Sequence, residues 1–317
     1  EIAALQTRIR QLAEERRAVI LAHNYQIGPI QDIADILGDS LGLAREAARL
    51  EDAEIIVFCG VHFMAETAAI LAPDKKVLLP DLDAGCFLAD TITADALTKW
   101  KDDYPDAVVV SYVNSTAAVK ALTDYCCTSG NAVQVAEAIP PDQEILFVPD
   151  MFLGAWVKEV TGRENIHLWP GECHVHSPLT LDMVLDKMAE YPEAEVMIHP
   201  ESRCSATLER MIREGDDRLG GRDVKIFSTG KMVKHAIEKD AGEFIVGTEL
   251  GILYRMEKEN PGKEFIPVSE RAVCQYMKRI TLPRVLNALE NLEHHVTVDP
   301  ETAVAAKKAV DRMIAIT

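Results

Sequence analysis

The sequence predicts an α/β protein built from three similar three-layer α/β/α domains, with parallel sheets, around a pseudo-threefold axis. Short apolar runs alternate with helical patterns, an order typical of parallel strands covered by helices on both faces. This order occurs three times along the chain. Each occurrence closes with an apolar strand, a proline and then a cysteine, at Cys86, Cys173 and Cys274.

The spacing of these cysteines indicates a repeat. Cys86 and Cys173 are 87 residues apart, and Cys173 and Cys274 are 101 apart. We assign the excess to the charged segment Ser202–Lys225, interpreted as an insertion. A period near 90 is too long for a solenoid repeat and fits triplicated small domains. Chance coincidence within an α/β protein is the weaker interpretation, because strand ends, serines and cysteines all recur at matched positions in the three repeats.

We therefore divide the chain into five parts. They are an N-terminal helix (1–17), a first domain (18–105), a second domain (106–190), a third domain (191–290) and a C-terminal helix packing on the core (291–317).

The expected elements follow from hydrophobic periodicity and from the turn residues between them. Glu1–Arg17 is an amphipathic helix, with Ile2, Leu5, Ile9 and Leu12 at helical spacing. Buried strands are expected at Ala18–Ala22, Glu54–Cys59, Lys76–Leu79, Ala107–Ser111, Glu144–Val148, Ile166–Trp169, Glu195–Ile198, Glu243–Val246 and Phe265–Pro267. Helices are expected at Ile30–Leu37, Leu41–Leu50, Phe63–Leu71, Asn131–Ile139, Leu153–Val160, Met232–Glu238, Leu253–Glu259 and Ala303–Ile316.

Composition excludes several classes of protein. The 317 residues carry a net charge of −18, which argues against nucleic acid or anionic membrane as a main partner. No apolar run approaches the roughly 20 residues that span a bilayer. The charged N-terminal helix has no signal-peptide core, so we expect a cytoplasmic location. Seven widely spread cysteines disfavour a disulfide framework and favour metal binding or catalysis.

Polar residues follow the first strand of each repeat. In parallel sheets, ligands lie at the carboxyl ends of the strands. Turn formation is the simpler reading of one such residue, but three matched sets favour a binding site. The sets are His23 and Tyr25, Tyr112 and Asn114, and His199 and Glu201.

Hydroxyl residues stand where the following helices begin, at Ser40, Ser129, Ser228 and Thr229. Such residues routinely cap helices and stabilise them by about 1 kcal/mol. Helix N-termini also bind anions through free N–H groups. The two readings are compatible, and the second predicts that carboxylates or phosphate are held without a cluster of lysine and arginine.

The three matched cysteines are better explained as metal ligands than as core residues. Structural zinc normally takes four ligands with close CxxC-type spacing, which this chain lacks. Three thiolates on a [4Fe-4S] cluster leave one iron open to act as a Lewis acid. His174 and His176 are further candidate ligands, although contact of one of them with substrate is the favoured interpretation.

Short motifs along nearly the whole chain together resemble quinolinate synthase of the quinolinate synthetase A family. These motifs are Leu21–Gln26 (LAHNYQ), Gln31–Ala34 (QDIA), Gly38–Leu41 (GDSL), Phe63–Glu66 (FMAE), Tyr112–Thr116 (YVNST), Cys127–Ala132 (CTSGNA), His199–Glu201 (HPE), Ser228–Gly230 (STG) and Gly247–Glu249 (GTE). Family members often carry cysteine directly after HPE, where this chain has Ser202.

The resemblance implies three α/β/α domains around a central [4Fe-4S] cluster. It implies a synthase, with dehydratase-type chemistry, that condenses iminoaspartate (iminosuccinate) with dihydroxyacetone phosphate to quinolinate, releasing phosphate and water, in de novo NAD biosynthesis. An L-aspartate oxidase or aspartate dehydrogenase is the expected supplier of iminoaspartate.

Roles follow from the resemblance residue by residue. Cys86, Cys173 and Cys274 look like the cluster ligands. Tyr25 and Glu201, with His199, look like the catalytic groups, and we expect a raised pKa for Glu201 as a general base. Substrate contacts are implied for His23, Ser40, Tyr112, Asn114, Ser129, His176, His199, Glu201, Ser228 and Thr229.

Two other classes of function use the same residues. A zinc- or thiol-dependent aldolase or lyase would use the cysteines without a cluster. A non-catalytic module that binds small anions or senses metal would use the same cavity without turnover.

Overall fold

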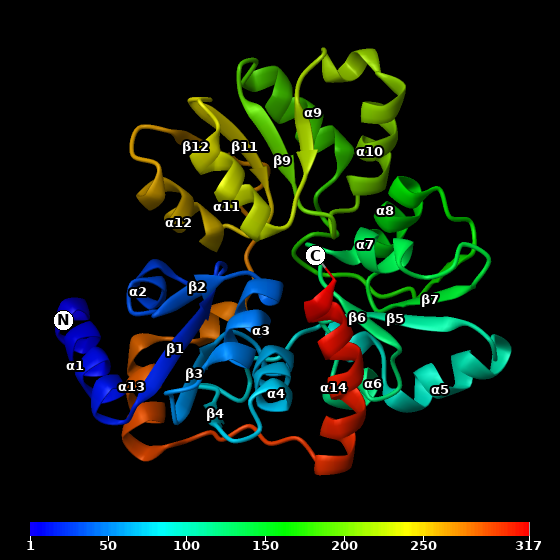
Figure 1. Cartoon of the computed structure of the whole chain (residues 1–317). Helices are drawn as coiled ribbons and strands as arrows, with labels where there is room; N and C mark the ends of the chain where they lie inside the picture. The colour runs from blue at the N-terminus through cyan, green and yellow to red at the C-terminus, as the bar shows by residue number, and fades with distance from the viewer. Residues whose placement is uncertain (317) are drawn as a thin grey trace.

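The computed structural model describes residues 1–316 and contains three four-stranded parallel sheets, each covered by helices. We call each sheet with its helices a unit. Figure 1 shows the three units grouped around a common centre. The predicted α/β class, with three similar parallel-sheet domains, is confirmed.

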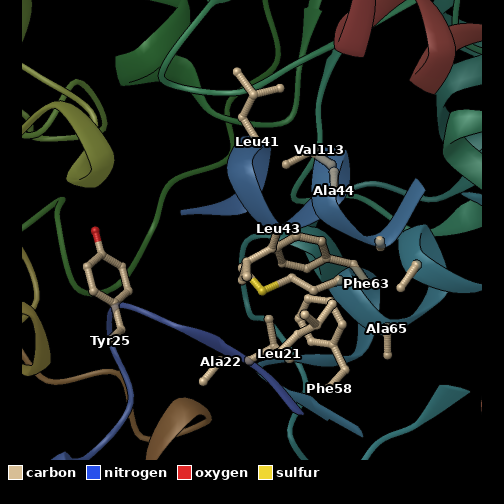
Figure 2. Packing of buried hydrophobic residues seen from close by; sticks show 14 of the residues in the cluster. Leu21, Ala22, Tyr25, Leu41, Leu43, Ala44, Phe58, Phe63, Ala65 and Val113 are labelled. Atoms are coloured by element: carbon tan, nitrogen blue, oxygen red, sulfur yellow. The ribbon is translucent and has the colours of Figure 1, made fainter. Parts of the chain in front are cut away.

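The first unit has the strand order β2-β1-β3-β4. Its strands are β1 (Ala18–His23), β2 (Ile36–Gly38), β3 (Ile55–Cys59) and β4 (Lys76–Leu78). Its helices are α2 (Gly28–Gln31), α3 (Ser40–Arg49) and α4 (His62–Leu71). Figure 2 shows apolar side chains of β1, β3, α3 and α4 packed together, with Tyr25 lying apart from them.

The second and third units repeat this order as β6-β5-β7-β8 and β10-β9-β11-β12. The second contains β5 (Val108–Tyr112), α6 (Ala117–Lys120), β6 (Tyr125–Cys127), α7 (Ala132–Glu137), β7 (Ile145–Val148), α8 (Met151–Thr161) and β8 (Ile166–Leu168). The third contains β9 (Glu195–Ile198), α10 (Ser205–Glu214), β10 (Val224–Ile226), α11 (Thr229–Glu238), β11 (Glu243–Gly247), α12 (Gly251–Glu259) and β12 (Glu264–Pro267).

The second strand of each unit differs from the sequence prediction. The helix expected over Ile30–Leu37 is wrong at its end, because α2 stops at Gln31 and Ile36–Gly38 pairs with β1. Ser202–Lys225 is likewise more than an insertion, since it contains α10 and most of β10. The extra length lies partly in α10, which has 10 residues where α2 and α6 have 4.

Three further helices connect the units, and each packs on the unit that follows. Leu97 of α5 (Ala94–Asp103) belongs to the core of the second sheet. Val184 of α9 (Leu181–Glu190) belongs to the core of the third. α13 (Leu282–Asn291) returns to the first unit and packs on α1 and β3. The domain boundaries proposed from the sequence stay predictions.

The terminal helices cover the first and second units. α1 (Ile2–Glu15) packs beside α13, and α14 (Pro300–Ala315) packs against α4, α6 and β6. The red helix in Figure 1 lies between these two units. Within residues 1–316, no helix combines the length and the apolar character needed to cross a bilayer.

Candidate active site

A cavity lies where the three units meet. The sequence-predicted residues, all except Ser228, line it. These are His23, Tyr25, Ser40, Cys86, Tyr112, Asn114, Ser129, Cys173, His176, His199, Glu201, Thr229 and Cys274. The roles assigned to them from the sequence stay predictions.

The ends of β1, β5 and β9 supply the polar part of the wall. Parallel strands bring their carboxyl ends to one edge of a sheet, so residues just beyond them face a shared space. The first and third units even repeat a local contact: the backbone N–H of Tyr25 donates to His23 Nδ1 at 3.2 Å, and that of Glu201 donates to His199 Nδ1 at 3.4 Å.

Glu201 is buried at the centre of a polar cluster. Its Oε2 lies 3.2 Å from His176 Nδ1, its Oε1 lies 3.6 Å from His199 Nδ1, and the Tyr112 hydroxyl donates to it. Burial raises the pKa of this carboxyl, but His176, His199 and Tyr112 outweigh it and lower the pKa to about 2. The raised pKa expected from the sequence is therefore wrong for the protein without metal, and Glu201 is ionised.

Tyr25 and His176 share a partner that sequence reasoning missed. The Tyr25 hydroxyl lies 2.6 Å from Thr248 Oγ1 and 3.4 Å from His176 Nε2, while His176 Nε2 lies 2.8 Å from Thr248 Oγ1. Burial, followed by the charge of Glu201, raises the pKa of Tyr25 well above its usual value. The hydroxyl is therefore protonated at neutral pH. The Gly-Thr-Glu motif at the end of β11 (Gly247–Glu249) was the feature of the sequence that could have identified Thr248.

Burial also sets the charge of His23 and His199. It lowers the pKa of His23 to about 4, against the charges of Asp39 and Glu201, and that of His199 to about 3, against the charge of Glu201. Both imidazoles are neutral at pH 7. His199 stacks on His176 with ring centroids 4.5 Å apart, and its Nε2 lies 3.1 Å from Ser129 Oγ.

The helix starts differ in detail from the expected caps. Asp39, not Ser40, caps α3, because its Oδ1 accepts from the N–H of Gly42 at 2.9 Å. Ser228 caps α11, and its hydroxyl lies 3.3 Å from Asp39 Oδ2. Ser228 thus lies behind the cavity wall. Ser40 and Thr229, the first residues of these helices, line the cavity.

Each of the three cysteines follows the last strand of a sheet and is half-buried. Burial raises the pKa of Cys86 to about 12, that of Cys274 to about 11 and that of Cys173 well above its usual value. Backbone hydrogen bonds oppose this rise at each sulfur, from residues two or three positions later in the chain: Leu88, Ala89, Val175, Tyr276 and Met277.

The structure also places a possible mixed metal site beside the thiols. The ligand atoms of Cys173, His176 and Glu201 lie within 4.8 Å of one another. His176 Nδ1 is 3.3 Å from Cys173 Sγ. Thiolate, imidazole and carboxylate are all ligands of transition metals.

A buried carboxylate that the sequence did not single out orders the Cys274 loop. Glu249 Oε1 accepts from the backbone N–H of Cys274 at 3.0 Å and pairs with Lys278 Nζ at 2.8 Å. The same ammonium donates to the carbonyl of Tyr25. This contact ties the loop after β12 to the end of β1.

Known proteins resemble this chain over almost its full length. Residues 7–315 match the sequence model of the family described as quinolinate synthetase A protein. The quinolinate synthase of Mycobacterium sp. (strain KMS) is 52% identical over 97% of this chain and 90% of its own. Those of Mycobacterium tuberculosis (strain ATCC 25618 / H37Rv) and Mycolicibacterium paratuberculosis (strain ATCC BAA-968 / K-10) are each 52% identical over 97% of this chain and 87% of their own. The chain therefore belongs to the quinolinate synthetase A family.

Proposed function

We propose that the chain is a quinolinate synthase of NAD biosynthesis. It condenses iminoaspartate with dihydroxyacetone phosphate and releases quinolinate, phosphate and water, using a [4Fe-4S] cluster held by Cys86, Cys173 and Cys274. The observation that carries the proposal is the meeting of three thiols, one from each unit, with the polar strand ends on one cavity. Family membership supports it.

The donor set of the three cysteines fits a cluster. Each sulfur comes from the same point of its unit, and backbone N–H groups close to each cysteine act on it. Hydrogen bonds to cluster sulfurs are a recurrent feature of iron–sulfur sites and help to set their potentials. When bound, the cluster supplies an open iron as a Lewis acid for substrate oxygen or nitrogen.

Neutral donors hold the anionic substrates in this proposal. Within the described chain, the residues lining the cavity include no lysine and no arginine. Hydroxyls of Ser40, Ser129 and Thr229 and the amide of Asn114 are the groups that we assign to carboxylate and phosphate oxygens. The buried Asn114 Oδ1 has no hydrogen-bond partner, which leaves it available to a substrate donor.

Tyr25, Glu201 and His199 move protons in this proposal. The Tyr25 hydroxyl is protonated and suits proton donation, with Thr248 fixing its orientation. The Glu201 carboxylate is ionised and suits proton acceptance. Neutral His199 contacts the Ser129 hydroxyl through Nε2 at 3.1 Å, and its Nδ1 accepts from the backbone N–H of Glu201, so we assign it to proton exchange on the Ser129 side of the cavity.

The supply of iminoaspartate sets the cellular context. We propose that an L-aspartate oxidase or aspartate dehydrogenase provides it, because an imine of this kind hydrolyses in water. We also propose a cytoplasmic location. All seven cysteines are unpaired, which suits a compartment that keeps thiols reduced.

The experiment is anaerobic iron and sulfide analysis combined with a quinolinate assay on the two substrates. We expect a brown protein that forms quinolinate. Replacing Cys86, Cys173 or Cys274 singly by serine should abolish the cluster, whereas Cys204→Ser, at a buried cysteine outside the cavity, should keep it. Full iron content in any of the three variants would contradict the ligand assignment.

The mixed site of Cys173, His176 and Glu201 favours a second candidate, a zinc-dependent lyase. A colourless protein that contains zinc, lacks sulfide and forms no quinolinate would support this candidate instead.

A further inference from the structure

Lys120, the last residue of α6, is fully buried. Its side chain is one of the largest of the fully buried side chains in residues 1–316. Lysine is almost never fully buried without a charged partner. Removing an ammonium group from water is costly unless an opposite charge and hydrogen bonds offset the loss. The position therefore calls for an explanation in terms of its surroundings.

The immediate surroundings of the ammonium group hold no anion. Lys120 Nζ donates to the carbonyl oxygen of Ser115 and lies 5.5 Å from the centroid of the Phe63 ring. Within the described residues, no carboxylate lies within 4.0 Å of it. The nearby Glu66 instead accepts from the backbone N–H of Ala117 at 3.0 Å.

Both partners of Lys120 connect it to the candidate active site. The Phe63 ring is part of the cavity wall. Ser115 follows Asn114, and its hydroxyl lies 2.9 Å from Ser111 Oγ and 3.0 Å from the carbonyl oxygen of Tyr112. The ammonium group thus fixes the loop that carries two residues of the cavity, while one aromatic ring lies between it and the cavity.

The charges around the cavity show what this cation can offset. Burial lowers the pKa of Lys120, and the acidic groups of Cys126, Glu66 and Cys86 act in the opposite direction when they are ionised. Lys278, also close to the site, is already paired with Glu249 at 2.8 Å. Three thiolates outweigh the formal charge of a resting [4Fe-4S] core, and both substrates are anions, so the loaded cavity is strongly negative.

We propose that Lys120 is the buried counter-cation of this site, offsetting the negative charge of the cluster and its anionic substrates while holding the Tyr112–Ser115 loop. It is a positioning residue, separated from substrate by the Phe63 ring. The inference rests on the proposed function, because an empty cavity with protonated thiols would give the cation nothing to offset.

Three substitutions separate the charge from the hydrogen bond. Lys120→Gln keeps an N–H donor for Ser115 but loses the charge, Lys120→Met loses both, and Lys120→Arg keeps the charge. Lys101→Gln is the matched control, because Lys101 Nζ also donates to a backbone carbonyl of the second unit, that of Leu122 at 3.2 Å, but does not line the cavity. If Lys120→Met does not fold, the comparison of Lys120→Gln with the wild-type protein tests the proposal.

The readouts are the midpoint reduction potential of the anaerobically reconstituted cluster and its rate of iron loss to a chelator. Reduction adds negative charge, so we expect a lower potential and several-fold faster iron loss in Lys120→Gln and Lys120→Met. Lys120→Arg and Lys101→Gln should stay near wild type.

A wild-type potential in folded Lys120→Gln would overturn the counter-cation role. A wild-type protein that takes up no iron and sulfide would overturn the proposed function, and this inference with it.

Discussion

Asp39 and Gly230 join the starts of two helices that belong to different units. Oδ2 of Asp39 accepts from the N–H of Gly230 in α11 at 3.3 Å, while Oδ1 accepts from the N–H of Gly42 in α3 at 2.9 Å. A Cβ atom on Gly230 would lie 2.6 Å from the same Oδ2, so a larger residue there would displace the carboxylate. One carboxylate thus caps α3 of the first unit and accepts from a free N–H of α11 in the third, the helix that Ser228 caps.

Asp39→Ala should therefore remove the cap of α3 and one hydrogen-bond acceptor at the start of α11. A lost cap and a lost hydrogen bond each cost about 1 kcal/mol, so we expect the free energy of unfolding to fall by about 2 kcal/mol in urea titrations. The matched control is Asp299→Ala, because Asp299 caps α14 alone through the N–H of Thr302 at 3.0 Å. Equal losses for the two variants would contradict a contribution from the contact with α11.

Tyr25→Phe should lower kcat by about 10²- to 10⁴-fold, the usual contribution of a positioned proton donor. The substitution removes only the hydroxyl, which contacts Thr248 and His176 inside the cavity. Steady-state kinetics with both substrates gives the measurement. Tyr254→Phe is the control, since its hydroxyl donates to Asp32 at 2.8 Å on the surface. Near wild-type turnover of Tyr25→Phe would remove the proposed role.

Asp81 should couple the cysteine loops of the first and third units. Its Oδ2 lies 3.0 Å from Arg279 Nε and 2.6 Å from Arg284, and Arg279 also reaches Asp83 at 2.8 Å. Asp81 is only 8% exposed, so solvent screens these contacts weakly.

A double-mutant cycle of Asp81→Ala and Arg279→Ala tests this coupling, and we expect about 1 kcal/mol in the free energy of unfolding. The exposed pair of Asp216 and Arg218, 2.6 Å apart, should couple by less than about 0.5 kcal/mol in the same cycle. Coupling no stronger than in the exposed pair would show that Asp81 does not fasten the two loops.

His23 should make the cluster-free protein sensitive to acid. Its pKa falls from 6.5 to about 4 on folding, so between these values the unfolded chain binds more protons than the folded chain. The stabilisation that this pKa difference contributes is complete above pH 6.5 and is lost as the pH falls towards 4. The loss amounts to about 3 kcal/mol.

Urea unfolding of the cluster-free protein between pH 7 and about pH 4 measures this dependence. His23→Gln should make it shallower, with His199 supplying much of the remainder, while His295→Gln, at an exposed histidine, should leave it unchanged. An unchanged slope in a folded His23→Gln variant would assign the acid sensitivity to other groups.

The parallel sheets and the cysteine positions could be predicted from the sequence, because apolar strands and the repeat phase are long-range signals. The second strand of each unit could not be predicted in this way. Ile36–Gly38, Tyr125–Cys127 and Val224–Ile226 have three residues each, as β4 and β8 do, but no proline and cysteine follow them to mark the end of a strand. They follow α2, α6 and α10, so helical periodicity obscures their starts.

Individual contacts within the site could not be predicted from the sequence either. Asp39 and Ser40 are both good capping residues, and only the backbone conformation decides that Asp39 performs the capping. Thr248 lies in the Gly247–Glu249 motif and Lys120 in a segment with no motif, and neither pattern indicates which side chains these residues contact. Their importance comes from partners more than 50 residues away, such as Tyr25 for Thr248 and Phe63 for Lys120.

The return of α13 to the first unit also sets an order of assembly. β3 and α1 leave the ribosome early, yet the helix that covers them is among the last segments to be made. The third unit receives α9 from the segment just before it, so it can complete its core during synthesis. The second unit receives α5 in the same way but is covered by α14 only at the end. The two units that are translated first are therefore finished last, and the ring of three units closes only when nearly the whole chain is free.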